Sequence, residues 1–204
     1  YPAFTNFIVV IKSINTYQRG SPEDLSEAPF DGQDTLNRFA ELIDAIAEID
    51  VLRKVSHILV GNEVDVYLHA HPEELDAYAV FLQQAAERIH VKMPWIKVGT
   101  IFTFNLFAFE PEVFDALTPH CDFVAYTYYP TEAFGSEFQM RSPDDVPGDV
   151  ALMASRAGAR PFALTEIGYA AAEATGSSEA AQKQFVEAAF GALRPYRADG
   201  KLEF

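Results

Sequence analysis

Two glutamates in this sequence each close a short apolar run. Glu63 ends the run His57-Ile-Leu-Val-Gly-Asn-Glu63, and Glu166 follows the apolar part of Pro161-Phe-Ala-Leu-Thr-Glu166-Ile-Gly-Tyr169. Short apolar runs of this kind predict buried strands, which would deliver each carboxylate to one rim of a sheet. Because two carboxylates at one rim can share acid, base and nucleophilic roles, the pair indicates a catalytic site.

The alternation of side chains along a strand predicts what surrounds each glutamate. Leu59 and Gly61 are expected on the same face as Glu63, where Gly61 would leave room for a ligand. Leu164 is expected on the same face as Glu166. If the strands close into a barrel, each carboxylate would lie above an apolar layer of the interior, and the two would bracket one bond at its mouth.

Strand and helix patterns alternate along the chain, which favours a parallel sheet with helical crossovers, either open or closed into a barrel. No glycine-rich phosphate-binding run follows a strand, and this weakens the nucleotide-binding form of the open sheet. A complete eight-stranded barrel typically takes about 250 residues, so a barrel of this length would be incomplete. The predicted strands cover 7–11, 57–63, 97–104, 122–129, 162–166 and the start of one at 201–204; the predicted helices begin after a cap at Asp34, near Pro72, at Pro111, near Pro147 and near Ser178.

Composition restricts the classes of protein to consider. The chain has 204 residues, 49% of them hydrophobic, which predicts a single globular domain over residues 1–204. A net charge of -15 argues against a nucleic-acid partner, because neutralising phosphates requires clustered Lys and Arg. No apolar run reaches the roughly 20 residues of a membrane span, so no membrane partner is expected. The single cysteine, Cys121, excludes an intramolecular disulfide and a cysteine-rich zinc site.

The sequence leaves the compartment and the oligomeric state open. The sequence begins at Tyr1, and no basic segment followed by an apolar run opens it. An export signal would therefore be removed or lie outside this segment, and a secreted or periplasmic location is compatible with that.

Three motifs together resemble the retaining glycoside hydrolases of clan A, which share a (β/α)8 barrel. Asn62-Glu63 is similar to the asparagine and acid/base glutamate that end the fourth strand in that clan. Glu166 looks like the nucleophile that ends the seventh strand, and Tyr128-Tyr129 is similar to an aromatic pair on the sixth. The resemblance covers nearly the whole chain in order and implies an incomplete TIM barrel, from about the third strand to the start of the eighth. The Tyr-Tyr-Pro run is similar to galactan-degrading members and the whole to cellulase-like members, so no family within the clan is assigned.

The resemblance also implies a role for each residue. Glu63 would be the general acid and later the base, and Glu166 the ionised nucleophile of a double displacement that cleaves a β-linked oligo- or polysaccharide. Tyr129 would orient Glu166 by a hydrogen bond, with Tyr128 as the alternative donor. Asn62 would bind the sugar 2-hydroxyl. No metal or organic cofactor is expected, and carbohydrate is the expected partner.

Several further residues are open between substrate binding and structure. Asp65 lies in a predicted rim loop after Glu63, and Asn105 follows a predicted strand, so both are candidates for substrate contact. The pair His69 and His71 precedes a helix start, where a surface loop is a better interpretation than a metal site. Four phenylalanines could stack on sugars but are better explained by packing: Phe102, Phe104, Phe107 and Phe109.

The sequence departs from the clan in two ways, and two other functions are compatible with its residues. The first two strands are absent, so the arginine that often supports the nucleophile is not identified, and the last strand stops at Phe204 before the usual tryptophan platform. This segment could therefore be inactive alone. A catalytically silent carbohydrate-binding barrel would not need both glutamates. A metal-dependent lyase or isomerase would use Glu63, Asp65 and Glu166 as oxygen ligands.

Overall fold

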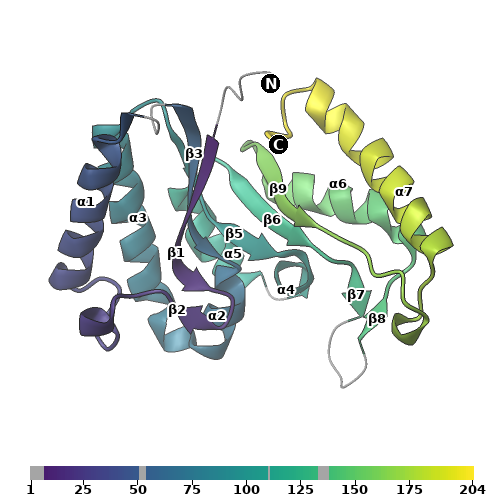
Figure 1. Cartoon of the computed structure of the whole chain (residues 1–204), viewed down its shortest axis with the longest axis horizontal. Helices are drawn as coiled ribbons and strands as arrows, with labels where there is room; N and C mark the ends of the chain where they lie inside the picture. Colours follow the sequence, from purple (N-terminus) through teal and green to yellow (C-terminus); the bar gives the residue numbers. More distant parts are fainter. Residues whose placement is uncertain (1–6, 51–53, 110, 133–137) are drawn as a thin grey trace.

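The structure is a computed structural model that describes residues 7–50, 54–109, 111–132 and 138–204. Strands and helices alternate along them, with the strands in a central curved layer (Figure 1). None of the helices described is both long and apolar enough to cross a bilayer. The strands are β1 (Phe7–Asn15), β2 (Gln18–Arg19), β3 (Val55–Asn62), β4 (Lys97–Gly99), β5 (Ile101–Thr103), β6 (Val124–Tyr128), β7 (Thr131–Glu132), β8 (Gln139–Met140) and β9 (Phe162–Ile167); the α-helices are α1 (Gln33–Ala47), α2 (Val64–Ala70), α3 (Leu75–Lys92), α4 (Phe104–Phe109), α5 (Glu112–Leu117), α6 (Val146–Arg156) and α7 (Glu179–Ala198).

The main strands are parallel neighbours in chain order. β1 pairs with β3 and β3 with β4, while β5 pairs with β6 and β6 with β9. Only Thr100 separates β4 from β5, and it marks where pairing with β3 ends and pairing with β6 begins. An isolated parallel bridge from Phe162 to Leu202 extends the series by one position. The predicted α/β architecture with a parallel sheet is confirmed, and over the described residues the sheet does not close.

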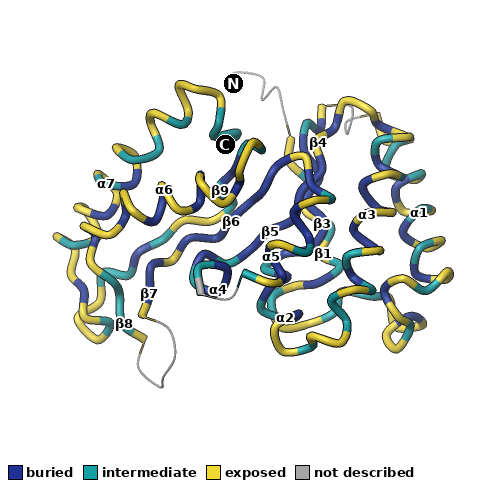
Figure 2. The backbone as a smooth tube through the Cα atoms, turned by 180° about the vertical axis from the view of Figure 1, so that it is seen from behind, coloured by how far each residue is buried: buried dark blue, intermediate teal, exposed yellow. Residues whose placement is uncertain are grey.

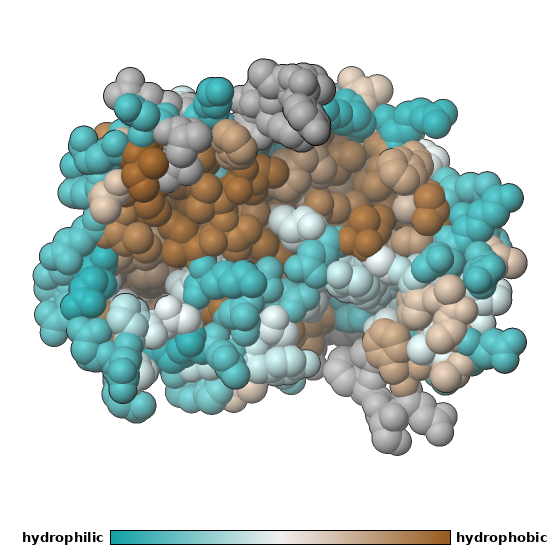
Figure 3. All heavy atoms as spheres, in the orientation of Figure 1, coloured by the Kyte–Doolittle hydropathy of each residue, from teal (hydrophilic) through white to brown (hydrophobic). Residues whose placement is uncertain are grey.

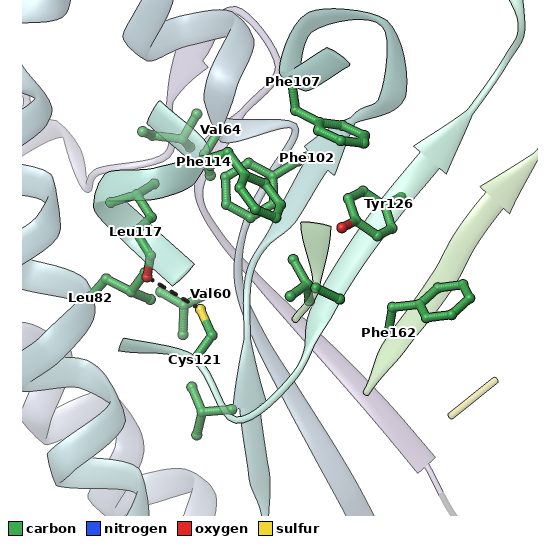
Figure 4. Close-up of a cluster of buried hydrophobic side chains, with 14 of the residues drawn as sticks. Val60, Val64, Leu82, Phe102, Phe107, Phe114, Leu117, Cys121, Tyr126 and Phe162 are labelled. Carbon is green, nitrogen blue, oxygen red and sulfur yellow. Dashed lines mark hydrogen bonds between the residues drawn. The ribbon is translucent and has the colours of Figure 1, made fainter. Parts of the chain in front are cut away.

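Helices cover the convex face of this layer, where the larger core lies. α1 and α3 pack beside β1 and β3, and α6 and α7 pack beside β9 (Figure 1). Figure 2 shows β3 and β6 buried, whereas β1 at one edge of the sheet and the outer faces of these helices are largely exposed. Figure 4 shows part of this core, in which the aromatic rings of Phe107 and Phe114 pack near Tyr126. Burial raises the pKa of the Cys121 thiol to about 12, so this buried cysteine stays protonated and unreactive.

A second, smaller core lies on the concave face. It consists of one side chain each from β3, β5, β6 and β9 and of Phe123 just before β6, and it resembles a layer of a barrel interior. Leu59 belongs to this core and therefore marks the concave face of β3, and Ala163 likewise marks the concave face of β9. Its members are Leu59, Ile101, Phe123, Ala125 and Ala163, with Phe204 packed against them.

Apolar side chains are exposed at both edges of the sheet. Figure 3 shows two apolar patches, one beside β1 and one beside β9 and α7. Phe7 and Ile8 on β1 are each 41% exposed. At the other edge, Ile167 is 45% exposed and Phe190 is 70% exposed. A cavity of about 480 Å³ lies beside β1 and α1, and one of about 420 Å³ beside β9 and α7.

The element predictions are largely confirmed, with three corrections. Asp34 lies within the first turn of α1, and Gly32 takes the N-cap position instead. The predicted strand 97–104 is interrupted at Thr100, and Phe104 already begins α4. The predicted rim loop after Glu63 is helix α2. Apolar periodicity is a weak signal in helices as short as α2 and α4, which tertiary packing stabilises.

Candidate functional site

Glu63 and Glu166 lie at the same rim of the sheet, where the parallel strands end. Glu63 directly follows β3, and Glu166 lies near the end of β9. Thr127 on β6 pairs in register with Glu166, and its hydroxyl donates to Glu63 Oε1 at 2.7 Å. Tyr129 responds to both acids: its hydrogen bond to Glu166, burial and the charges of Glu166 and Glu63 raise its pKa to about 12. Both carboxylates therefore lie at this rim, Glu63 in contact with Thr127 and Glu166 level with it on β9.

Glu63 is held by two threonine hydroxyls in an unusual backbone conformation. Its φ of 50° and ψ of 48° are left-handed, which costs a non-glycine residue about 1–3 kcal/mol. This turn lets the chain leave β3 and enter α2 at once. Thr16, at the end of β1, donates to Glu63 Oε2 at 2.6 Å, while Thr127 occupies Oε1. Both carboxylate oxygens of this half-buried glutamate are therefore positioned, one from the turn after β1 and one from β6.

A bulge in β9 turns Glu166 toward the concave face. Leu164 pairs with Tyr126, but the next pair joins Glu166 to Thr127, so one residue of β9 is skipped. The extra residue reverses the alternation beyond it. Leu164 packs into the convex core, whereas Glu166 lies level with Thr127. The prediction that Leu164 and Glu166 share a face is wrong for this reason.

Gly61 does not leave space for a ligand. Because its φ is +89°, a side chain at position 61 would point toward the helical layer. An added Cβ there would lie 2.3 Å from Val64 Cγ1 and 2.4 Å from the Tyr78 hydroxyl oxygen. The prediction of a ligand space below Glu63 is therefore wrong. Glycine is required at this position by backbone conformation and by the close approach of the helices.

Tyr129, rather than Tyr128, contacts Glu166. The Tyr129 hydroxyl donates to Glu166 Oε2 at 2.8 Å, and the side chain is 41% exposed at the rim. An added Cβ on Gly168 would lie 2.5 Å from Tyr129 Cε1, so glycine makes room for this ring. Tyr128 is fully buried on the opposite face of β6 and donates to Asp149 Oδ2 at 2.7 Å. Burial and this hydrogen bond raise the pKa of Tyr128, which stays a structural donor.

On the resemblance to retaining glycoside hydrolases, we expect replacing Tyr129 with Phe to lower hydrolysis of a glycoside substrate by about 10- to 100-fold, because a hydrogen bond to a charged group contributes about 1.5–3 kcal/mol. The measurement is kcat/KM of purified protein on an activated aryl glycoside. Tyr128→Phe is the matched control, since the same hydroxyl is removed one residue earlier. We expect that control to lower the free energy of unfolding more than it lowers kcat/KM. Equal losses of kcat/KM in the two variants would contradict the assignment.

The two predicted asparagines, Asn62 and Asn105, form hydrogen bonds with protein groups near the rim. Asn62 is largely buried, and its Nδ2 donates to Asn15 Oδ1 at 3.4 Å. Asn105 Nδ2 donates to the Tyr129 carbonyl at 3.2 Å and to Thr131 Oγ1 at 2.7 Å. Asn105 therefore supports the turn that carries Tyr129. The amide nitrogen of each asparagine donates to a protein oxygen.

Asp65 lies too deep to contact a substrate in this structure. Its side chain is 1% exposed, and its carboxylate accepts hydrogen bonds from the backbone N–H and the hydroxyl of Thr103, the latter at 2.7 Å. Burial raises the pKa of Asp65 to about 7, the bonds from Thr103 oppose this, and the charge of Glu63 adds to it. Asp65 thus anchors the first turn of α2 to the end of β5.

The buried Asp65 should make the stability of the protein depend on pH. Its pKa of about 7 in the folded state lies above the ordinary 3.8, so between these values the folded protein retains a proton that the unfolded chain releases. The free energy of unfolding should therefore fall as pH rises from about 4 to 7, by up to about 1.4 kcal/mol per pH unit from this group. Urea unfolding of Asp65→Asn at several pH values should lack this component. Asp76→Asn, on the exposed side of α3, is the control, and an equal effect there would contradict the prediction.

One group of side chains has the composition of a metal site. Ligand atoms of His71, Glu73 and Glu74 lie within 4.8 Å of one another. Protein groups already engage them: Tyr67 donates to Glu74, which also pairs with Arg19 at 3.5 Å, and the His71 ring stacks on Tyr67. Glu73 Oε1 lies 3.5 Å from His71 Nδ1, and His69 is not part of this group.

Thr16 and Thr127 were not found from the sequence. Threonine is common near strand ends, and only the register of β1, β3 and β6 reveals that both hydroxyls meet Glu63. The left-handed turn at Thr16 also has no sequence signal, since glycine and asparagine are the residues that predict one.

Comparison with known proteins supports the fold. No protein-family model matches the chain, and no curated protein matches it in sequence. Similar solved structures include an apo β-glucosidase designated 1317 (13% identity, TM-score 0.66, 95% of this chain and 61% of that chain). Others are the GH53 catalytic domain of Ignisphaera aggregans (16%, 0.65, 90% and 55%) and the AHE enzyme from Alicyclobacillus herbarius (14%, 0.61, 96% and 62%). The chain thus spans somewhat more than half the length of these proteins, and the similarity at such identities shows a shared fold.

Proposed function

We propose that this chain forms part of a glycoside hydrolase that cleaves β-linked oligo- or polysaccharides with retention of configuration. The observation that carries this proposal is the joining of Glu63 and Glu166 through β6: Thr127 binds Glu63 and lies level with Glu166, which Tyr129 binds. Similar folds occur in structures described as a β-glucosidase and a GH53 catalytic domain, which supports it further. With β1 as the third strand of an eight-stranded barrel, β3, β6 and β9 would be the fourth, sixth and seventh.

The proposed reaction has two displacements. In the first, a Glu166 oxygen attacks the anomeric carbon while Glu63 gives its proton to the leaving glycosidic oxygen, which departs as an alcohol. In the second, Glu63, now ionised, takes a proton from water; the water oxygen attacks the anomeric carbon and the bond to Glu166 breaks. Side chains and water supply every group that these steps require.

Tyr129 has a defined part in this scheme. A pKa of about 12 keeps its hydroxyl protonated at neutral pH, so it remains a donor to Glu166. This hydrogen bond would orient the Glu166 carboxylate for attack. When the glycosyl ester forms, Glu166 loses its charge and the hydrogen bond becomes weaker. Asn62, beside Glu63 at the rim, is proposed to reach the sugar 2-hydroxyl, and carbohydrate is the proposed partner.

The stereochemistry of the product tests this proposal. The protein is incubated with a panel of aryl β-glycosides, and the anomer formed first is identified by proton NMR before mutarotation. Retention, with activity unchanged in a chelator, is the expected result. A first-formed α-anomer would indicate inversion, for which the carboxyl groups lie about 6.5–9.5 Å apart rather than about 5–5.5 Å, and would overturn the double displacement. Activity that disappears in a chelator would favour a metal-dependent reaction.

A further inference from the structure

We propose that Thr16 is a positioning residue which, together with Thr127, holds Glu63 in one orientation in both of its protonation states. This inference rests on the proposed function and assigns part of its machinery to a residue on a different strand.

Backbone strain is concentrated at one hydrogen-bonded pair. Among the described non-glycine residues, positive φ values occur at Thr16 (56°) and Glu63 (50°), and these two side chains are bonded to each other at 2.6 Å. A β-branched residue in this region is a genuine outlier. Strained residues persist where the surrounding structure determines their conformation, and they gather at functional sites.

Thr16 occupies a position at which turn formation alone would favour glycine. Asn15 pairs with Gln18, so Thr16 is the first residue of the two-residue turn between β1 and β2. Such turns favour Gly, Asn or Asp where φ is positive. The backbone N–H of Thr16 donates to the Asn62 carbonyl at 2.9 Å, which places this turn directly beside Glu63. A hydroxyl is thereby held at a place where the turn itself does not require one.

A hydroxyl suits a carboxyl group that changes its protonation state. The hydroxyl of threonine can donate one hydrogen bond and can also accept. It can donate to the ionised Glu63 and, after rotating, accept a hydrogen bond from the protonated form. An ammonium, guanidinium or backbone N–H in its place could only donate and would favour the ionised form. Thr16 at Oε2 and Thr127 at Oε1 would thus keep the carboxyl in place from the acid step to the base step.

Variants at Thr16 separate the hydroxyl from the backbone. Thr16→Val keeps the shape and loses the hydroxyl; Thr16→Gly loses the hydroxyl and relieves the strained φ; Thr16→Ser keeps the hydroxyl. The readout is kcat/KM on aryl β-glycosides with leaving groups of increasing basicity, because only basic leaving groups need the proton of Glu63. We expect Val and Gly to lower kcat/KM about 10- to 100-fold on phenyl glycosides and much less on 2,4-dinitrophenyl glycosides. Serine should restore most of the loss.

Three results would overturn the inference: full activity of Thr16→Gly on poor leaving groups, an equal loss on good and poor leaving groups, or no restoration by serine. Thr16→Gly keeps the test valid if Val fails to fold, since glycine suits the turn. Glu63→Gln and Glu166→Gln are measured on the same substrates. Normal turnover of those two would refute the proposed function itself. Their impairment, combined with normal Thr16 variants, would refute only the positioning role.

Discussion

Replacing Glu166 with Gln should reduce hydrolysis of an activated aryl β-glycoside by roughly 10⁴-fold or more, because the amide cannot form the glycosyl ester. The side chain keeps its size, and Tyr129 can still donate to the remaining amide oxygen, so folding should change little. The measurement is kcat/KM, with a thermal melt to confirm the fold. Glu187→Gln, on the exposed side of α7, is the matched control, for which we expect unchanged kinetics.

Covalent labelling makes the same prediction independent of the rate. A 2-deoxy-2-fluoro aryl glycoside, which forms the ester quickly and hydrolyses it slowly, should increase the mass of the protein by one glycosyl unit. The label should be recovered on the peptide containing Glu166. Attachment to another residue, or normal turnover of Glu166→Gln, would show that Glu166 is not the nucleophile.

Replacing Glu63 with Gln should produce a loss that depends on the leaving group. General acid–base catalysis contributes about 10²- to 10⁴-fold, so kcat/KM on phenyl or alkyl glycosides should fall by that amount. On 2,4-dinitrophenyl glycosides kcat/KM should fall much less, because the leaving group departs without a proton. The second displacement would lack its base, so kcat should fall; added azide, which can attack the anomeric carbon and displace Glu166 without a base, should restore it.

Azide rescue distinguishes Glu63 from a residue that only supports the fold. Azide is already anionic and needs no base, so it should accumulate as the β-glycosyl azide with the Gln variant. Neither Glu166→Gln nor Glu187→Gln should respond to azide. A uniform loss on all leaving groups without rescue would contradict the acid/base role of Glu63.

The two largest effects depend on how β6 relates the glutamates. Thr127 contacts one carboxylate and pairs with the residue that carries the other, so its position couples the two sites. This arrangement follows from parallel pairing of β6 with β9, with β3 reaching the same rim. Placement of functional groups at the carboxyl ends of parallel strands is the general pattern of α/β folds.

Local sequence patterns predict much of this arrangement. Apolar runs that end at Glu63 and Glu166 predict two strands and their rim, and alternation with helices predicts parallel pairing. A helix beginning near Ser178 is also predicted correctly; in the structure Ser178 is the N-cap of α7, and its hydroxyl accepts from the Ala181 N–H at 3.1 Å. These features depend on residues near one another in the chain, which is why periodicity and capping rules reach them.

The orientation of the acidic groups was decided by tertiary structure. Glu166 faces inward because β9 skips one residue against β6, Glu63 lies between Thr16 and Thr127, and Asp65 turns into the protein to meet Thr103. Each of these depends on register with a strand that is distant in sequence. A single-residue shift reverses the face of every side chain beyond it, while the local composition stays the same. Residue types and strand ends were therefore predictable, whereas the directions of the side chains required the packed sheet.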